Sequence, residues 1–306
     1  MDFEVIINLS LLEMDSSLEF APVGNKRVLS IINDYEDSQW RYRKFQEFIW
    51  DNIAETSLSH REREILIGQP HSMLVAAAQN LRLTDKEDDI SKGSELAEIV
   101  LYGIMKHQYG ALPVVPKIFY KQNSQDNAKG ADSVHIVPEG NGDFSLWFGE
   151  AKFYNSIEDA RLAKIIESVG NSLKTDKLKK ENSIITNISD LDFLGLDEDL
   201  KLRIRSALSN KASIDSIKSK INIPILMLHE CKITANASFA DEAYRDEIVS
   251  YHKDRAVSYF RKQVKDLPKK VVLYDQVKFH IILFPVPSKE NIVNKFVSNV
   301  SHYKDQ

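Results

Sequence analysis

The stretch L-W-F-G-E-A-K-F-Y, residues 146–154, decides how this chain folds. Its first residues would be apolar on both faces of a β-strand, which is typical of a strand that is covered on both sides. Side chains alternate across a strand, so Glu150 and Lys152 follow Leu146 and Phe148 on a single face. A carboxylate and an ammonium are expensive to bury there unless each has a partner and a task. We therefore expect these two charges to belong to a functional site.

A third charged residue is expected beside them. Asp132 begins a predicted strand over residues 131–137, and the turn-forming residues P-E-G-N-G-D at 138–143 come next. This pattern predicts a hairpin that joins the two strands. In such a hairpin Asp132 lies across from Glu150 or Lys152.

These residue types suit a metal-dependent reaction at a phosphate. The carboxylates of Asp132 and Glu150 and the carbonyl oxygen of Ala151 offer oxygen ligands to a hard cation. Mg²⁺ retains several waters and needs few protein ligands, and Mn²⁺ can substitute for it. A bound metal would polarise a scissile phosphate and lower the pKa of a bound water. Lys152 would position that water or stabilise charge that develops on the phosphoryl group.

The predicted elements have a definite order around the hairpin. A helix with Ser94 as its N-cap precedes three strands, and a helix and a strand follow them. In chain order this core comprises a helix at 94–109, strands at 117–121, 131–137 and 145–154, a helix from 157 to about 178 and a strand at 223–229. A further helix at 241–265 and a strand at 278–284 complete it.

The region before this core is expected to be a separate unit. A strand at 3–12 and helices at 35–54, 61–66 and 72–81 are predicted there. The polar segment 84–89 is typical of a linker. We therefore predict an N-terminal α/β region over 1–88 and a core over 89–306. The core would contain a helical insertion at about 181–222.

Composition limits the classes of protein that this chain can represent. Of its 306 residues 43% are hydrophobic and 28% charged, as in ordinary globular proteins. No apolar run approaches the roughly 18 residues that span a bilayer. The N-terminus lacks the features of a signal peptide, and Cys231 is the single cysteine. We expect a cytoplasmic protein without a disulfide, a cysteine-based zinc site or membrane contact.

The net charge constrains how nucleic acid can be held. A charge of −5 argues against binding by general counterion release. Any contact with nucleic acid would therefore be local, metal-assisted or shared with a partner. The sequence also contains no glycine-rich phosphate loop, so an ATP-driven step would belong to that partner.

The spacing of the charged residues resembles a known nuclease pattern. Asp132, seventeen intervening residues (133–149) and then Glu-Ala-Lys form the D…E-x-K arrangement of the PD-(D/E)XK, or restriction-endonuclease-like, nucleases. This resemblance implies an α/β fold in which a mixed sheet is flanked by helices. It also implies that a glutamate on the first core helix supports the metal. Glu98 is the preferred candidate and Glu95 the second, while Ala131 replaces the proline of the pattern.

A closer resemblance covers more of the chain. K-G-S-E-L-A-E-I-V-L-Y (92–102), P-K-I-F-Y-K (116–121), K-G-A-D-S-V-H (129–135) and W-F-G-E-A-K-F-Y (147–154) resemble the HamA family. HamA proteins are the nuclease subunits of the Hachiman anti-phage defence system. The resemblance implies a bacterial or archaeal DNA endonuclease that works with HamB, a superfamily 2 helicase. No motif identifies the surface that contacts the helicase.

The resemblance carries the catalytic roles to Asp132, Glu150 and Lys152. Two alternatives remain at this point. The chain could be a catalytically silent subunit that senses DNA or scaffolds the helicase, although the intact D…E-x-K set argues against this. It could also be a ribonuclease that uses the same chemistry, because the sequence does not separate DNA from RNA.

Overall fold

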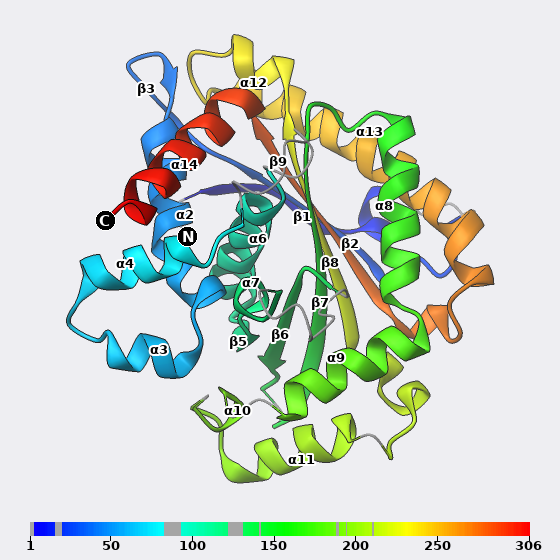
Figure 1. Ribbon diagram of the computed structural model, residues 1–306. Helices are drawn as coiled ribbons and strands as arrows, with labels where there is room; N and C mark the ends of the chain where they lie inside the picture. The colour runs from blue at the N-terminus through cyan, green and yellow to red at the C-terminus, as the bar shows by residue number, and fades with distance from the viewer. Residues whose placement is uncertain are drawn as a thin grey trace.

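A sheet of seven strands forms the centre of the described part of the protein (Figure 1). Its strand order is β1-β2-β9-β8-β7-β6-β5. The computed structural model describes residues 3–15, 20–82, 93–121, 131–140, 142–187, 190–193, 195–209 and 211–306. The strands are β1 (Glu4–Ser10), β2 (Lys26–Ile32), β5 (Leu112–Val115), β6 (Ser133–Pro138), β7 (Phe144–Tyr154), β8 (Ile221–Glu230) and β9 (Lys278–Val286).

The middle of this sheet is parallel and its margins are antiparallel. Strand β8 runs parallel to both β7 and β9, and β9 runs parallel to β2. Strands β1 and β2 are antiparallel, and so are β5, β6 and β7 to one another. Every residue of β8 except Glu230 is buried, as expected for a strand with helices on both faces. The predicted α/β class with a mixed sheet is confirmed.

Helices α8 (Asp159–Ser172) and α13 (Glu242–Asp266) lie along one face of the sheet, at the right in Figure 1. Ile165 of α8 and Tyr259 of α13 belong to the same buried cluster as Phe148 of β7. Phe148 therefore points to the face that α8 covers. Side-chain alternation places Glu150 and Lys152 on that face as well, which brings them under α8.

The opposite face carries α2 (Tyr42–Ser57), α6 (Ser94–Tyr109) and α14 (Lys289–Lys304) (Figure 1). Trp147 of β7 and Val100 of α6 join the second buried cluster there. Residues 96 to 105 of α6 are all buried, so this helix is covered nearly all around. Strand β7 therefore has a buried apolar residue on each face, as its sequence predicts.

The N-terminal strands extend the same sheet. Strand β2 pairs with β9 in parallel, with Val28 opposite Ile281, and β1 lies outside β2 at the edge. The N-terminal extension and the C-terminal strand are thus continuous through one sheet. The segment 84–89, where the boundary between the two regions is predicted, lies outside the described residues.

The segment predicted as a helical insertion, about 181–222, begins within the first helix after α8 and reaches the start of β8. Its helices occupy the lower part of Figure 1, beyond the ends of β6 and β7. Leu178 and Ile185 of its first helix pack into the cluster on the α8 face. The elements are α9 (Thr175–Asn187), α10 (Asp190–Phe193), α11 (Glu198–Leu208) and the 3-10 helix η2 (Ile214–Lys220).

The remaining elements are short and lie around the sheet. No helix within the described ranges is long and apolar enough to cross a bilayer. The short elements are α1 (Leu11–Met14), β3 (Tyr35–Glu36), β4 (Gln39–Trp40), α3 (His60–Ile65), α4 (Pro70–Gln79), α7 (Lys117–Lys121), α12 (Lys232–Asn236), η3 (Leu267–Lys269) and η4 (Tyr274–Gln276).

Two local predictions were wrong in kind. Residues 117–121, predicted as a strand, form helix α7, and the strand β5 precedes them. Five alternating residues are too few to separate a helix from a strand. The predicted helix at 35–54 begins only at Tyr42, because Asp37 and Ser38 adopt positive φ and turn the chain between β3 and β4.

One helix cap and the division of one helix also differ from prediction. Gly93 is the N-cap of α6, so Ser94 is the first helical residue, and its hydroxyl donates to Glu98 Oε1 at 3.4 Å. The helix predicted from 157 to about 178 is divided into α8 and α9.

Candidate active site

The hairpin brings the three predicted charged residues together. Ser133 of β6 pairs with Gly149 of β7, so Asp132, one residue earlier, stands beside Glu150. The backbone N–H of Asp132 donates to the carbonyl of Gly149 at 2.7 Å. Lys152 follows on the same face of β7. Of the two predicted positions for Asp132, across from Glu150 or from Lys152, the first is observed.

A glycine on β7 allows the close packing behind this site. A Cβ added to Gly149 would lie 2.1 Å from Ser133 Oγ and 2.7 Å from Leu101 Cδ2. Real side chains never approach that closely, so helix α6 and strand β6 both need a residue without a side chain here. Gly149 thus fixes how near α6 comes to the hairpin that carries Asp132.

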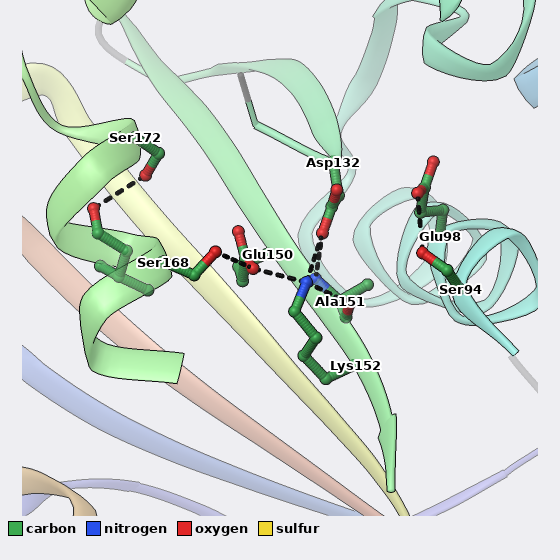
Figure 2. Close-up of polar contacts among 9 residues, drawn as sticks. Ser94, Glu98, Asp132, Glu150, Ala151, Lys152, Ser168 and Ser172 are labelled. Carbon is green, nitrogen blue, oxygen red and sulfur yellow. Dashed lines mark hydrogen bonds and ion pairs between the residues drawn. The ribbon is translucent and has the colours of Figure 1, made fainter. Parts of the chain in front are cut away.

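The ammonium of Lys152 lies where three oxygens meet (Figure 2). Its Nζ is 2.6 Å from Glu150 Oε1, 3.2 Å from Asp132 Oδ2 and 3.2 Å from the carbonyl oxygen of Ala151. Those are the three groups that the sequence predicts as metal ligands. The side chains of Glu150 and Asp132 are 5% and 15% exposed, and that of Lys152 is 29% exposed. The group is therefore enclosed at Glu150 and opens to solvent beside Lys152.

Each carboxylate has a further donor that fixes its orientation. The backbone N–H of Ala151 donates to Asp132 Oδ2 at 3.0 Å. The hydroxyl of Ser168, on α8, donates to Glu150 Oε1 at 2.5 Å (Figure 2). Hydrogen bonds from such outer groups hold metal-binding carboxylates in one orientation. The site is thus preorganised from β7 on one side and from α8 on the other.

The charges of the site act strongly on one another. Burial raises the pKa of Glu150, and the negative charge of Asp132 adds to this, while Lys152 and Ser168 oppose it. Burial acts to lower the pKa of Lys152, but Asp132 and Glu150 outweigh it and raise that pKa above its ordinary value. Lys152 is therefore held as an ammonium, and its charge balances the carboxylates.

The two glutamates of α6 occupy different surroundings. Glu98 is buried and lines a small cavity together with Asp132 and Lys117. Glu95 accepts the backbone N–H of Arg82, at 3.0 and 3.2 Å from its two oxygens. Glu98 therefore faces the hairpin, while Glu95 ties α6 to the end of the preceding helical region.

The residues present fit a hard divalent cation. Among the described residues no three His, Cys, Asp or Glu side chains form a cluster that could hold a metal. A metal here would therefore rely on Asp132, Glu150 and the Ala151 carbonyl, an all-oxygen set that suits Mg²⁺ or Mn²⁺ with retained waters. The ammonium of Lys152 among these oxygens is evidence that the point favours positive charge.

Sequence reasoning missed three residues around the site. Ser168 of α8 donates a hydrogen bond to Glu150. Glu181, which forms an ion pair with Lys117, accepts the backbone N–H of Ala131, next to Asp132. A serine within an amphipathic helix carries no signal of such a contact. Lys117 was assigned to a strand and Glu181 to the insertion, so their proximity could not be inferred from spacing.

Comparison with known proteins agrees with this geometry. A family model described as HamA matches residues 10–300 of the 306. A search of curated proteins gave no match. The match extends far beyond the motifs at 92–154 and includes the N-terminal strand β2 and the C-terminal strand β9. The chain therefore belongs to the HamA family, a component of Hachiman anti-phage defence.

Proposed function

We propose that this protein is a metal-dependent DNA endonuclease whose active site comprises Asp132, Glu150 and Lys152. The observation that carries the proposal is the convergence of two carboxylates and a carbonyl on one point within 3.2 Å of Lys152 Nζ. A cluster of this kind at the end of a hairpin, partly open to solvent, suits the chemistry of phosphodiester hydrolysis better than it suits structural support.

Each residue would have a distinct task in cleavage. Asp132, Glu150 and the carbonyl of Ala151 would hold the metal, with Glu98 supporting it from α6. The metal would supply Lewis acidity toward the phosphate and a more acidic bound water. Lys152, held as an ammonium, would donate hydrogen bonds to the attacking water or to a phosphate oxygen. Ser168 would keep Glu150 in its binding orientation.

Control by a helicase is the second part of the proposal. Family membership supports a multi-component defence system. The chain lacks a phosphate-binding loop, so ATP-driven movement would come from a superfamily 2 helicase subunit (HamB-like). The net charge of −5 also suits a nuclease that receives DNA from a partner better than one that captures it alone.

A cleavage panel tests both parts. Plasmid, linear duplex, single-stranded DNA and RNA would each be incubated with Mg²⁺ or Mn²⁺, with and without the helicase and ATP. We expect metal-dependent DNA cutting that the helicase controls, that Asp132→Asn abolishes and that Lys152→Ala slows by about 10²–10³-fold. Full digestion by the isolated chain at high salt would refute partner control. Cutting of RNA alone would replace the deoxyribonuclease with a ribonuclease.

The alternative of a silent subunit makes the opposite prediction. A DNA-sensing or scaffolding protein would cut nothing under any of these conditions. In cells, its Asp132→Asn and Lys152→Ala variants would defend against phage as well as the wild type does. Loss of defence in both variants, with the proteins still folded, would exclude that reading.

A further inference from the structure

A buried ion pair contacts the residue that precedes Asp132 in the chain. Lys117 of α7 and Glu181 of α9 have side chains that are 3% and 4% exposed. Lys117 Nζ lies 2.6 Å and 2.8 Å from the two carboxylate oxygens of Glu181. The first element of the predicted insertion is thus joined to the core by a buried pair of charges.

Glu181 also holds the backbone that precedes Asp132. The N–H of Ala131 donates to Glu181 Oε1 at 3.1 Å. The next N–H along the chain, that of Asp132, donates to the carbonyl of Gly149. Two successive peptide groups are therefore fixed by different elements, one by α9 and one by β7. This arrangement leaves little freedom in the position of the Asp132 side chain.

Stability alone does not account for a charged pair at this place. Apolar residues of similar volume commonly pack as well as a buried ion pair or better. What Glu181 provides and an apolar residue cannot is an acceptor for the Ala131 N–H. Lys117 in turn balances the charge that this acceptor brings, and it lines the same cavity as Glu98 and Asp132.

We propose that Glu181 is a positioning residue for Asp132, acting through the Ala131 N–H and held in place by Lys117. Metal affinity and cleavage would then depend on the docking of α9 against the core. This inference rests on the proposed nuclease function, because it assigns Glu181 a role at the same site. A small displacement of a reacting group is enough to slow an enzyme greatly.

A pair of double variants isolates the acceptor from the charge. Lys117→Met with Glu181→Gln removes both charges and keeps an acceptor oxygen for Ala131. Lys117→Met with Glu181→Leu also removes both charges but leaves no acceptor. Neither variant leaves an unpaired buried charge, so both are expected to fold. Thermal melting of each protein verifies this.

Two measurements compare the variants. Calorimetric titration with Mn²⁺, without nucleic acid, gives the metal affinity. Cleavage of duplex DNA by the complex with the helicase gives kcat and KM. Glu198→Gln is the control, because it removes the ion pair of Glu198 with Lys201 on α11, away from Ala131.

The glutamine variant is expected to resemble the wild type in both measurements. The leucine variant is expected to bind Mn²⁺ about 10–100-fold more weakly and to lose a similar factor in kcat, as outer-shell changes commonly do. Its KM for DNA should equal that of the wild type. The Glu198→Gln control should match the wild type in Mn²⁺ affinity, kcat and KM. Equal metal affinity and kcat in the two double variants would overturn the proposal.

The test separates this inference from the proposed function. If the wild-type complex cut no DNA with any metal, the nuclease assignment would fail. The Mn²⁺ titration would still report whether the Ala131 acceptor orders the metal ligands. If the wild type cut DNA but the two double variants did not differ, the role of Glu181 alone would fail.

Discussion

The positively charged ammonium of Lys152 lies between the carboxylates of Asp132 and Glu150 and the carbonyl oxygen of Ala151. A divalent cation bound by these oxygens would stand close to this ammonium and repel it. The same ammonium would stabilise negative charge on a phosphoryl group during cleavage. Lys152 is therefore expected to oppose metal binding and favour catalysis, two effects that a single substitution can separate.

Replacing Lys152 with methionine tests this opposition. We expect Lys152→Met to bind Mn²⁺ at least as tightly as the wild type, because a competing positive charge is gone. Its cleavage rate should fall by about 10²–10³-fold, the usual effect of removing one group that stabilises transition-state charge. Calorimetry and single-turnover cleavage measure the two quantities. Weaker metal binding would contradict the account, and so would an unchanged rate.

The hydroxyl of Ser168 is the second residue whose role can be isolated. Ser168→Ala removes the donor to Glu150 Oε1, and we expect metal affinity to fall by about 10-fold or more. Ser172→Ala is a matched control one turn later on α8, because the Ser172 hydroxyl donates to the backbone carbonyl of Val169. Equal affinities in the two variants, measured by Mn²⁺ titration, would show that Ser168 does not orient Glu150.

The sequence predicts the main charged residues because their signal is local. Glu150 and Lys152 alternate along one strand, and Asp132 is one hairpin away. The preference for Glu98 over Glu95 agrees with the cavity that Glu98 lines, although its role remains a prediction. Ser168 and Glu181 come from helices whose packing is decided by the whole fold, so no spacing rule reveals them.

At the scale of elements, the hairpin and α6 depend on a residue without a side chain. Gly149→Ala would place a methyl group within 2.1 Å of Ser133 Oγ. We expect this to destabilise the protein by about 1–3 kcal/mol, as overpacking of a core does. Gly140→Ala is the control, because its added Cβ meets no atom within 4 Å. Urea unfolding measures both, and equal stabilities would contradict the packing described here.

Periodicity predicted the long elements well and the short ones poorly. The expected and observed bounds of α6 coincide, and β7 differs by one residue. Segment 117–121 was mistaken for a strand because a stretch of five residues can fit the repeat of a helix and the repeat of a strand. Residues 35–41 were predicted to be part of a helix, but the positive φ angles of Asp37 and Ser38 produce a turn there.

At the scale of the whole molecule, the sheet joins distant parts of the chain. Strand β2 pairs with β9, and paired residues such as Lys26 and Phe279 are slightly more than 250 positions apart in the sequence. Such a parallel contact leaves no local trace, so the sequence did not show that the N-terminal strands extend the core sheet. The observed fold therefore couples the stability of the N-terminal region to that of the site-bearing strands.

Acid is expected to destabilise the whole molecule. Burial lowers the pKa of His135 and His280 to about 3 and that of His229 to about 4. Burial lowers the pKa of His252 as well. The ordinary value is 6.5, so below that pH the unfolded chain binds protons that the folded protein excludes. Stability present above pH 6.5 is thus lost progressively toward pH 4.

A melting series against pH measures this loss. Each histidine that stays neutral when folded should remove about 2 kcal/mol of stability at pH 5. His135→Leu should make the decline between pH 6.5 and 5 shallower, while the exposed His302→Gln should leave it unchanged. A stability that did not decline between pH 6.5 and 5 would contradict the burial of these four rings as neutral groups.

The carboxylate of Glu150 is expected to take part in metal-dependent DNA cleavage. Glu150→Gln keeps the size of the side chain and removes its charge, and Glu139→Gln makes the same change at an exposed position in the hairpin turn. The most direct test compares plasmid cleavage with Mg²⁺ by the two variants, each with the helicase present. We expect Glu139→Gln to cut at the wild-type rate and Glu150→Gln not to cut. Equal cutting by both variants would contradict this role of Glu150.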